Sequence, residues 1–233
     1  MTQAEGWLAL AALMATVATY LLAQRLDARV RRPWTNPVGL TVAAMILMVG
    51  LGGLPLDAYQ RGTSPLVWAL RPAVVALGWL IYRQRAVLRN WLAPLLAGSL
   101  VGSAVSLLVT PWLARMAGAE PLLQSALALK SVTSAVGVDL AERVGADAAL
   151  TVPLVIVTGI AGAILGPPLA RLVGFGEEAL GVAVGTNSHG IGTAALAARE
   201  MEAGTALSGL AMALSAVLSG MLAPLAFTLL GLP

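Results

Sequence analysis

Eight apolar runs of about bilayer length dominate this sequence and restrict the folds that it can adopt. In hydrocarbon every backbone N–H and C=O must find a partner inside the protein, so only helices and closed barrels span a membrane. The runs are too long for barrel strands, which alternate over roughly ten residues. The sequence therefore predicts an all-α integral membrane protein, a polytopic helical bundle with a single domain over residues 1–233. In chain order the runs are Gly6–Gln24, Val38–Leu54, Ser64–Tyr82, Trp91–Met116, Pro121–Glu142, Ala148–Val173, Glu178–Arg199 and Thr205–Leu232.

The composition agrees with a membrane location. Hydrophobic residues make up 58% of the chain and charged residues 11%, whereas a soluble globular protein has about a quarter charged residues. The net charge of +3 comes from arginines between apolar runs, where they orient the chain in the bilayer and do not indicate nucleic-acid binding. With no cysteine and one histidine, thiol chemistry and a multi-histidine metal site are excluded. We expect no metal and no cofactor, and a coupling ion, H⁺ or Na⁺, is left open.

Seven arginines concentrate in two short segments, one after the first run and one after the third. Cytoplasmic loops of membrane proteins carry an excess of Lys and Arg, so both segments are predicted to face the cytoplasm. The first run has no positive segment before it and no convincing cleavage site after it, which favours a retained membrane helix over a signal peptide. We expect a multi-pass protein of the bacterial inner membrane. The seven are Arg25, Arg29, Arg31, Arg32, Arg83, Arg85 and Arg89.

The stretch Gly185–Ala194, GTNSHGIGTA, places the only histidine, His189, among glycines and small polar side chains. Polar backbone interrupted by glycine survives in a membrane only where it is buried in protein or lines a watery cavity. Broken helices of this kind form the substrate and ion sites of secondary transporters. Alternatively, the glycines let another helix approach closely, and His189 hydrogen-bonds a neighbouring carbonyl.

Lys130 is the only lysine and lies in the middle of a run, where an unpaired charge costs several kcal/mol. If the run is one helix, Thr133 and Ser134 share its face at i+3 and i+4, and this group would suit a carboxylate. The alternative is a lysine that reaches to the interface. Arg71-Pro72 interrupts the third run, and Arg71 either lines the same cavity or pairs with an acid such as Asp139 or Glu142.

An internal repeat is visible at an offset of 56 residues, because Pro111–Gly118 matches Pro167–Gly174. The same offset carries Lys130-Ser131-Val132-Thr133 onto Thr186-Asn187-Ser188-His189. The predicted repeat units are 91–142 and 148–199, each with a membrane helix followed by an interrupted polar helix. If the interrupted helices are re-entrant, the copies are inverted and Lys130 and His189 meet in one cavity; if they span, the copies are parallel.

These residues resemble the LrgB/CidB family of bacterial inner-membrane proteins. The matching segments are Asn36-Pro37, Pro72–Leu77 with Tyr82, Lys130–Thr133, Thr158–Ala163 with Gly166-Pro167, and Gly185–Ala194 followed by Glu200. The family usually has glycine at the position of Arg71. The resemblance implies one of two roles: an antiholin-like modulator of murein hydrolase activity and lysis, or a small-carboxylate transporter related to the plastidial glycolate/glycerate carrier. It also implies a small holin-like partner of the LrgA/CidA type.

The sequence reading is therefore a transporter of a small monocarboxylate such as pyruvate, glycolate or glycerate, working with that partner and expected to form a homo-oligomer in the bilayer. The rival reading is a regulator of murein hydrolase export and lysis that transports nothing. An enzyme is not expected, because no GxSxG, P-loop or HExxH motif is present. The predicted substrate-binding residues are Lys130, Ser131, Thr133, Ser134, Thr186, Asn187, Ser188, His189, Thr193 and Arg71.

Overall fold

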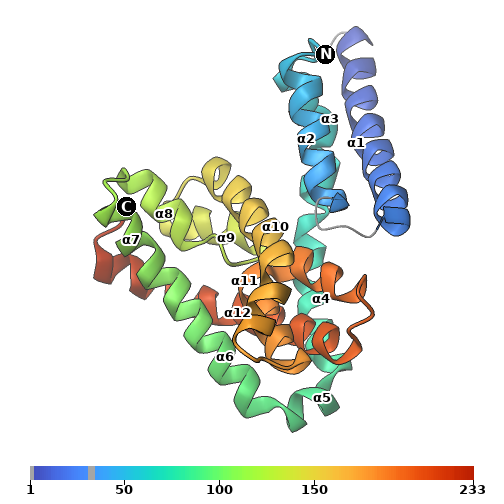
Figure 1. Cartoon of the computed structure of the whole chain (residues 1–233). Coiled ribbons are helices and arrows are strands. Elements are labelled where there is room, and N and C mark those ends of the chain that lie inside the picture. The colour runs from blue at the N-terminus through green and yellow to red at the C-terminus, as the bar shows by residue number, and fades with distance from the viewer. Residues whose placement is uncertain (1–2, 31–34) are drawn as a thin grey trace. The chain divides into compact units, whose positions relative to one another are not determined.

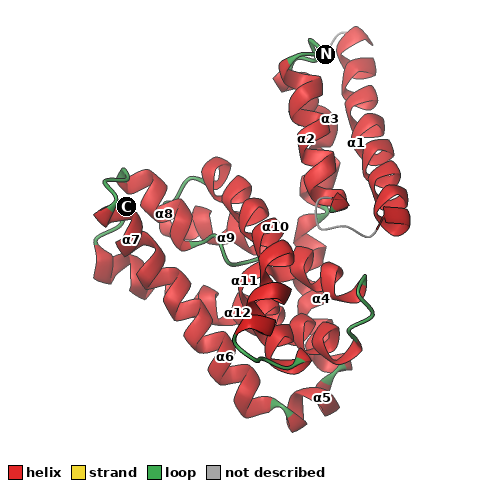
Figure 2. Ribbon diagram, in the orientation of Figure 1, coloured by secondary structure: helices red, strands yellow, loops and turns green. Residues whose placement is uncertain are grey.

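The computed structural model describes residues 3–30 and 35–233, and the side chains of residues 3, 4, 70, 71, 73 and 74 lie outside that description. Every regular element within these residues is a helix (Figure 1, Figure 2), which confirms the predicted all-α class. In chain order the helices are α1 (Gln3–Val30), α2 (Pro37–Gly50), α3 (Leu56–Trp68), α4 (Leu70–Arg83), α5 (Arg85–Asn90), α6 (Leu92–Ala104), the π-helical turn η2 (Val105–Val109), α7 (Thr110–Met116), α8 (Pro121–Ala128), α9 (Ser134–Val144), α10 (Ala148–Leu172), α11 (Glu177–Ala197) and α12 (Glu202–Leu230).

Four helical stretches in the described part of the chain are long and apolar enough to cross a bilayer, which makes this a membrane protein. Large apolar side chains on their outer surfaces are exposed, as lipid contact requires. The four stretches are Glu5–Val30, Leu92–Met116, Ala148–Leu172 and Glu202–Leu230.

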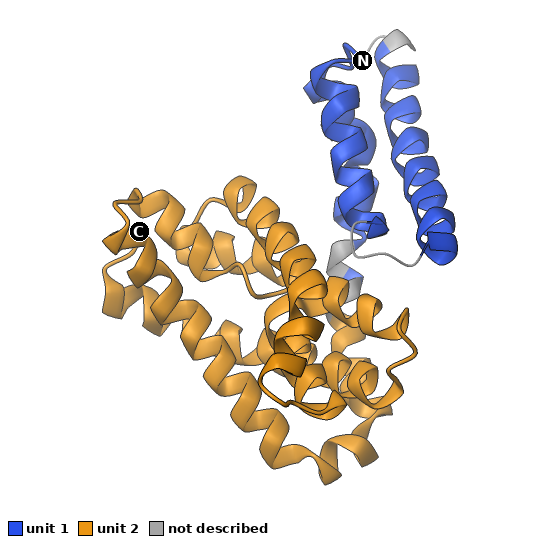
Figure 3. Ribbon diagram, in the orientation of Figure 1, with its two compact units in different colours: residues 1–72 blue, residues 73–233 orange. Residues whose placement is uncertain are grey.

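The chain divides into two compact units, residues 1–72 and 73–233 (Figure 3). In the first unit α1 packs against α2 and α3. Gly62 of α3 lies against the backbone of Ala9, so closely that any side chain there would overlap the Ala9 carbonyl oxygen. Asn36 caps α2 by accepting hydrogen bonds from the N–H groups of Val38 and Gly39, at 3.0 and 3.1 Å.

The second unit is built around α12, which α6, α9 and α11 contact. Leu107, Leu129, Val155 and Phe227 belong to one buried apolar cluster that joins four different segments. Small residues set the helix spacing, as is usual in membrane bundles. Gly181 and Gly185 of α11, for example, lie directly against the backbone of α12.

Two predicted interruptions are present in this second unit. The chain leaves helical geometry between Ala128, the last residue of α8, and Ser134, the first of α9. Helix α11 kinks at His189, which has φ 42° and ψ −134°, a conformation that non-glycine residues rarely adopt. The run predicted at Ser64–Tyr82 is also divided, but at Ala69, between α3 and α4.

The prediction that Thr133 and Ser134 share a helix face with Lys130 was wrong. Helix α8 ends before Lys130, and the N–H of Lys130 bonds the Leu127 carbonyl oxygen at 3.3 Å in a tightened last turn. Thr133 instead caps α9, and its Oγ1 accepts a hydrogen bond from the Val136 N–H at 3.3 Å. The i+3 and i+4 spacing has no meaning across a broken helix.

Helix boundaries recur at the offset of 56 residues. The stretch α6–η2–α7, Leu92–Met116, corresponds to α10, Ala148–Leu172, and both contain 25 residues. Helix α8 starts at Pro121 and α11 starts at Glu177. The N-cap of α9, Thr133, corresponds to the kink residue of α11, His189.

Close contacts fix the relative directions of these helices. Gly98 and Gly102 of α6 face Val182 and Thr186 of α11, in the same order, so α6 runs parallel to the first half of α11. Along α10 the order is reversed, because Gly162 faces Ser188 and the later Gly166 faces Val184. Helices α6 and α10, which correspond at the offset of 56 residues, therefore run in opposite directions.

Candidate functional site

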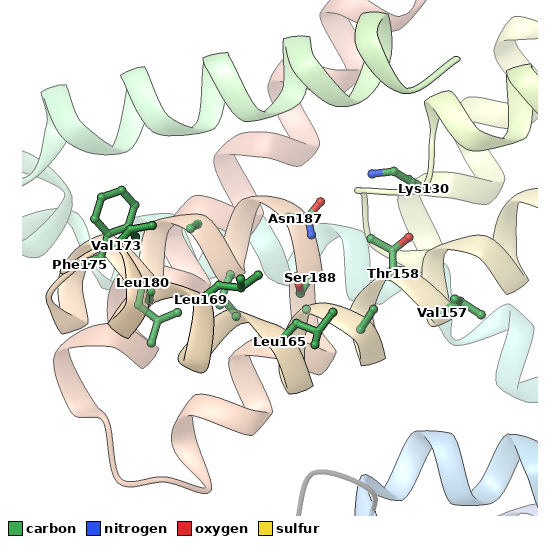
Figure 4. A pocket seen from close by; sticks show the side chains of 16 residues that line it. Lys130, Val157, Thr158, Leu165, Leu169, Val173, Phe175, Leu180, Asn187 and Ser188 are labelled. Carbon is green, nitrogen blue, oxygen red and sulfur yellow. The ribbon is translucent and has the colours of Figure 1, made fainter. Parts of the chain in front are cut away.

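A cavity of about 650 Å³ lies along α10 and the first half of α11, and Lys130 lies toward one end of it (Figure 4). Four polar side chains line it: Lys130, Thr158, Asn187 and Ser188. Most of the remaining wall is apolar, and its larger side chains include Val157, Leu165, Leu169, Val173, Phe175 and Leu180. Lys130 is the one charged residue among the described residues of the lining.

A chain of hydrogen bonds joins the two interrupted helices at the polar end of the cavity. The Lys130 ammonium donates to Ser131 Oγ at 2.9 Å, and Ser131 Oγ donates to Asn187 Oδ1 at 3.0 Å. Ser131 and Asn187 are 56 positions apart and correspond to each other in the predicted repeat. Within the described residues Lys130 has no carboxylate partner, so its charge is compensated by dipoles alone. The Asn187 amide N–H groups remain to donate to a ligand.

Glycines on α10 allow this arrangement. A side chain at Gly162 would overlap Ser188 Oγ, and one at Gly159 would lie 2.7 Å from His189 Cε1. The two helices therefore approach closely at the kink, and Ser188 reaches the wall that Thr158 also lines. The close approach depends on residues with no side chain.

His189 lies outside the lining of the cavity. Its side chain is buried, and its Nε2 lies 3.1 Å from the Val155 carbonyl oxygen. This contact agrees with the alternative considered from the sequence, in which His189 hydrogen-bonds a neighbouring carbonyl and serves in packing. Thr193 Oγ1 donates to the His189 carbonyl oxygen at 2.8 Å and lies 2.7 Å from Ser208 Oγ on α12. These contacts hold the kink of α11 against α10 and α12.

Four more predicted site residues lie away from the cavity or beyond description. Thr186 faces Gly102 of α6, and its hydroxyl is buried with no hydrogen-bond partner in the described structure. Thr133 and Ser134 begin α9 and do not belong to the lining. The Arg71 side chain lies outside the described residues. Asp139, one acid considered for it, pairs with Arg143 at 3.0 Å.

The structure brings together Lys130, Ser131, Asn187 and Ser188 of the predicted site, and it adds Thr158. A signal for Thr158 was present in the sequence, because it is a polar residue next to Gly159 in the middle of an apolar run. The apolar wall had no such signal, since its residues look like any others that face lipid.

An all-α polytopic membrane protein, with two interrupted helices joined at the polar end of a cavity, is the class that this fold and site define. The chain belongs to the LrgB-like family, whose model matches residues 16–229, and the resemblance read from the sequence is thereby confirmed.

Similar proteins match over nearly their whole length. The holin-like protein CidB of Staphylococcus aureus is 30% identical over 217 residues, which cover 93% of this chain and 94% of that protein. The protein YwbG of Bacillus subtilis is 29% identical over 219 residues, covering 94% of this chain and 97% of that protein. No solved structure matches the chain significantly.

Proposed function

We propose that this protein transports small monocarboxylates, such as pyruvate, glycolate or glycerate, across the bacterial inner membrane. The observation that carries the proposal is the Lys130–Ser131–Asn187 hydrogen-bond chain at the polar end of the cavity. It gathers a cation and neutral donors at the junction of two broken helices. Secondary transporters build their binding sites at such junctions.

The charge of Lys130 favours a monoanion. A cation held inside a membrane protein costs several kcal/mol unless it is paired, and the described lining offers it no acid. A carboxylate would supply the counter-charge and accept charge-assisted hydrogen bonds. Thr158 and Asn187 line the cavity on the side of Lys130 and are available as neutral donors.

We infer that residues 91–142 and 148–199 are inverted copies of one unit. The inference is supported by helix boundaries 56 residues apart, by the opposite directions of α6 and α10, and by the Ser131–Asn187 hydrogen bond between equivalent positions. Residues on a two-fold axis contact their own equivalents. Inverted repeats around a central site are a frequent basis of alternating access.

A second function, regulation of murein hydrolase export and lysis, is favoured by one observation. Relatives of the chain carry the name holin-like protein CidB. In that role the glycine-spaced helix faces would serve assembly, in a homo-oligomer or with a small LrgA/CidA-type membrane protein. We propose the same partner for the transporter, and we propose no role in carboxylate binding for His189, Thr186 or Thr193.

Uptake of labelled pyruvate and glycolate into proteoliposomes, with and without the holin-like partner, tests the two functions against each other. The Lys130→Met variant should lose at least about tenfold of the uptake at low substrate, because a hydrogen bond to a charged group contributes roughly 1.5–3 kcal/mol. Arg115→Met is the matched control, since it removes an exposed positive charge outside the lining. Uptake that does not depend on Lys130 would refute the assignment of the binding site. A correctly folded protein that shows no uptake would favour the role as a regulator of murein hydrolase export and lysis.

A further inference from the structure

The cavity is much larger than a three-carbon acid. Pyruvate has six non-hydrogen atoms, and at about 30 Å³ for each atom of the size of a water molecule it fills roughly 180 Å³. The cavity measures about 650 Å³. Such a ligand would fill less than a third of this space, which is open along Leu165, Leu169 and Phe175, each of them more than half exposed.

The polar groups of the lining lie in the half of this space that contains Lys130. Figure 4 shows Lys130, Thr158 and Asn187 toward one end, and Val173, Phe175 and Leu180 toward the other. From Thr158 to Val173 the chain follows α10, a distance of about 22 Å at a rise of 1.5 Å per residue. The wall is therefore amphipathic along its length, with one charged end and a long apolar remainder.

The charge at the polar end limits the ligand to one carboxylate. Lys130 is the single charged side chain among the described residues of the lining. A second carboxylate farther along would lie among Leu165, Leu169 and Leu180, in apolar surroundings that offer it no partner. Burying an unpaired charge costs more free energy than the rest of a small ligand can return.

We propose that the preferred substrates of this site are monocarboxylates with an apolar chain of more than three carbons, whose carboxylate lies at Lys130 and whose chain lies along α10 toward Phe175. The proposal rests on the proposed carboxylate site and names its substrate class. Shorter acids share the same head-group contacts and bind more weakly, because they leave the apolar wall unused.

Equilibrium binding of straight-chain acids from propionate to decanoate, measured on the full chain in lipid nanodiscs, tests the proposal without any substitution. Each added methylene that enters the cavity should tighten binding about fourfold, which corresponds to roughly 0.8 kcal/mol per buried methylene. Empty nanodiscs of the same lipid composition measure partition into the bilayer, and the fourfold steps refer to binding after this background is subtracted.

A filling variant locates the chain. Ala183 lines the cavity one helical turn before Asn187 and is exposed, so Ala183→Phe should reduce octanoate affinity by at least tenfold and by a larger factor than it reduces propionate affinity. Ala194→Phe is the matched control, because Ala194 is an exposed alanine of the same helix outside the lining.

The possible results distinguish the chain-length proposal from the proposal of a carboxylate-binding site. Affinity that does not rise with chain length, while pyruvate binding still depends on Lys130, overturns the chain-length proposal and leaves the carboxylate site standing. The absence of any Lys130-dependent carboxylate binding overturns both. A chain-length dependence that Ala183→Phe leaves unchanged places the apolar chain in the bilayer and also overturns the proposal.

Discussion

Gly162→Ala should open the contact between α10 and α11 on which the candidate site depends. The added methyl group would overlap Ser188 Oγ and lie 2.8 Å from Ser188 Cβ. Both helices must then move apart or Ser188 must change its position. Extra volume forced into a well-packed contact costs about 1–3 kcal/mol.

Gly220→Ala on α12 is the matched control, because a methyl group there would meet no described atom within 4 Å. Both substitutions gain roughly 1 kcal/mol of helix propensity, so the difference between them isolates the packing strain at Gly162. For a chain of this size 1 kcal/mol corresponds to roughly 2–4 °C in Tm. We therefore expect the Gly162→Ala midpoint to lie roughly 2–12 °C below that of Gly220→Ala, measured by thermal unfolding of the purified protein in one detergent.

A second substitution checks the cause. Ser188→Ala removes the hydroxyl that overlaps most and leaves the 2.8 Å contact with its Cβ, so the double variant Gly162→Ala/Ser188→Ala should recover part of the lost midpoint. Such coupling between residues in contact amounts to about 0.5–3 kcal/mol. Equal midpoints for Gly162→Ala and Gly220→Ala would refute the reasoning, because the two helices would then not be held at the distance described.

Two further predictions concern the helix ends and the topology. Glu177 accepts a hydrogen bond from the Gly204 N–H at 2.9 Å, at the start of α12. Glu177→Ala should lower Tm by roughly 2–4 °C, because a lost helix cap costs about 1 kcal/mol. Glu177→Gln keeps an acceptor and should lower Tm less, and an equal loss of Tm in both variants would argue against the cap. Single cysteines at Gln24 and Asn90 should resist an impermeant thiol reagent in intact cells, because they adjoin the two arginine-rich segments that are predicted to be cytoplasmic. A single cysteine at Gln60, in the stretch between those segments, should react. The reverse pattern of labelling would show that the protein has the opposite orientation.

The candidate site was predicted in part. Lys130 and Asn187 stood out because a charged or amide side chain in an apolar run is costly wherever it lies. The error over Thr133 and Ser134 arose because helical spacing was continued through a break that starts at Leu129. A polar segment can leave helical geometry only where neighbouring segments supply hydrogen-bond partners for its unpaired backbone groups. The spacing of its residues carries no information on those partners.

The sequence by itself determined the all-α membrane class, the places where two helices break and the offset of 56 residues between similar segments. These features depend on interactions within one run: backbone hydrogen bonding in hydrocarbon, the local preferences of glycine and proline, and the cost of a buried charge. A single run of residues contains all of that information.

Only the tertiary structure decided which polar residues meet. Ser131 contacts Asn187 across 56 positions, and His189 turns away to the carbonyl oxygen of Val155. Both outcomes depend on how closely α10 and α11 approach at Gly159 and Gly162, a distance set by two surfaces together. The apolar wall of the cavity has the same origin, because a leucine that faces lipid and a leucine that lines a binding site differ only in what lies opposite.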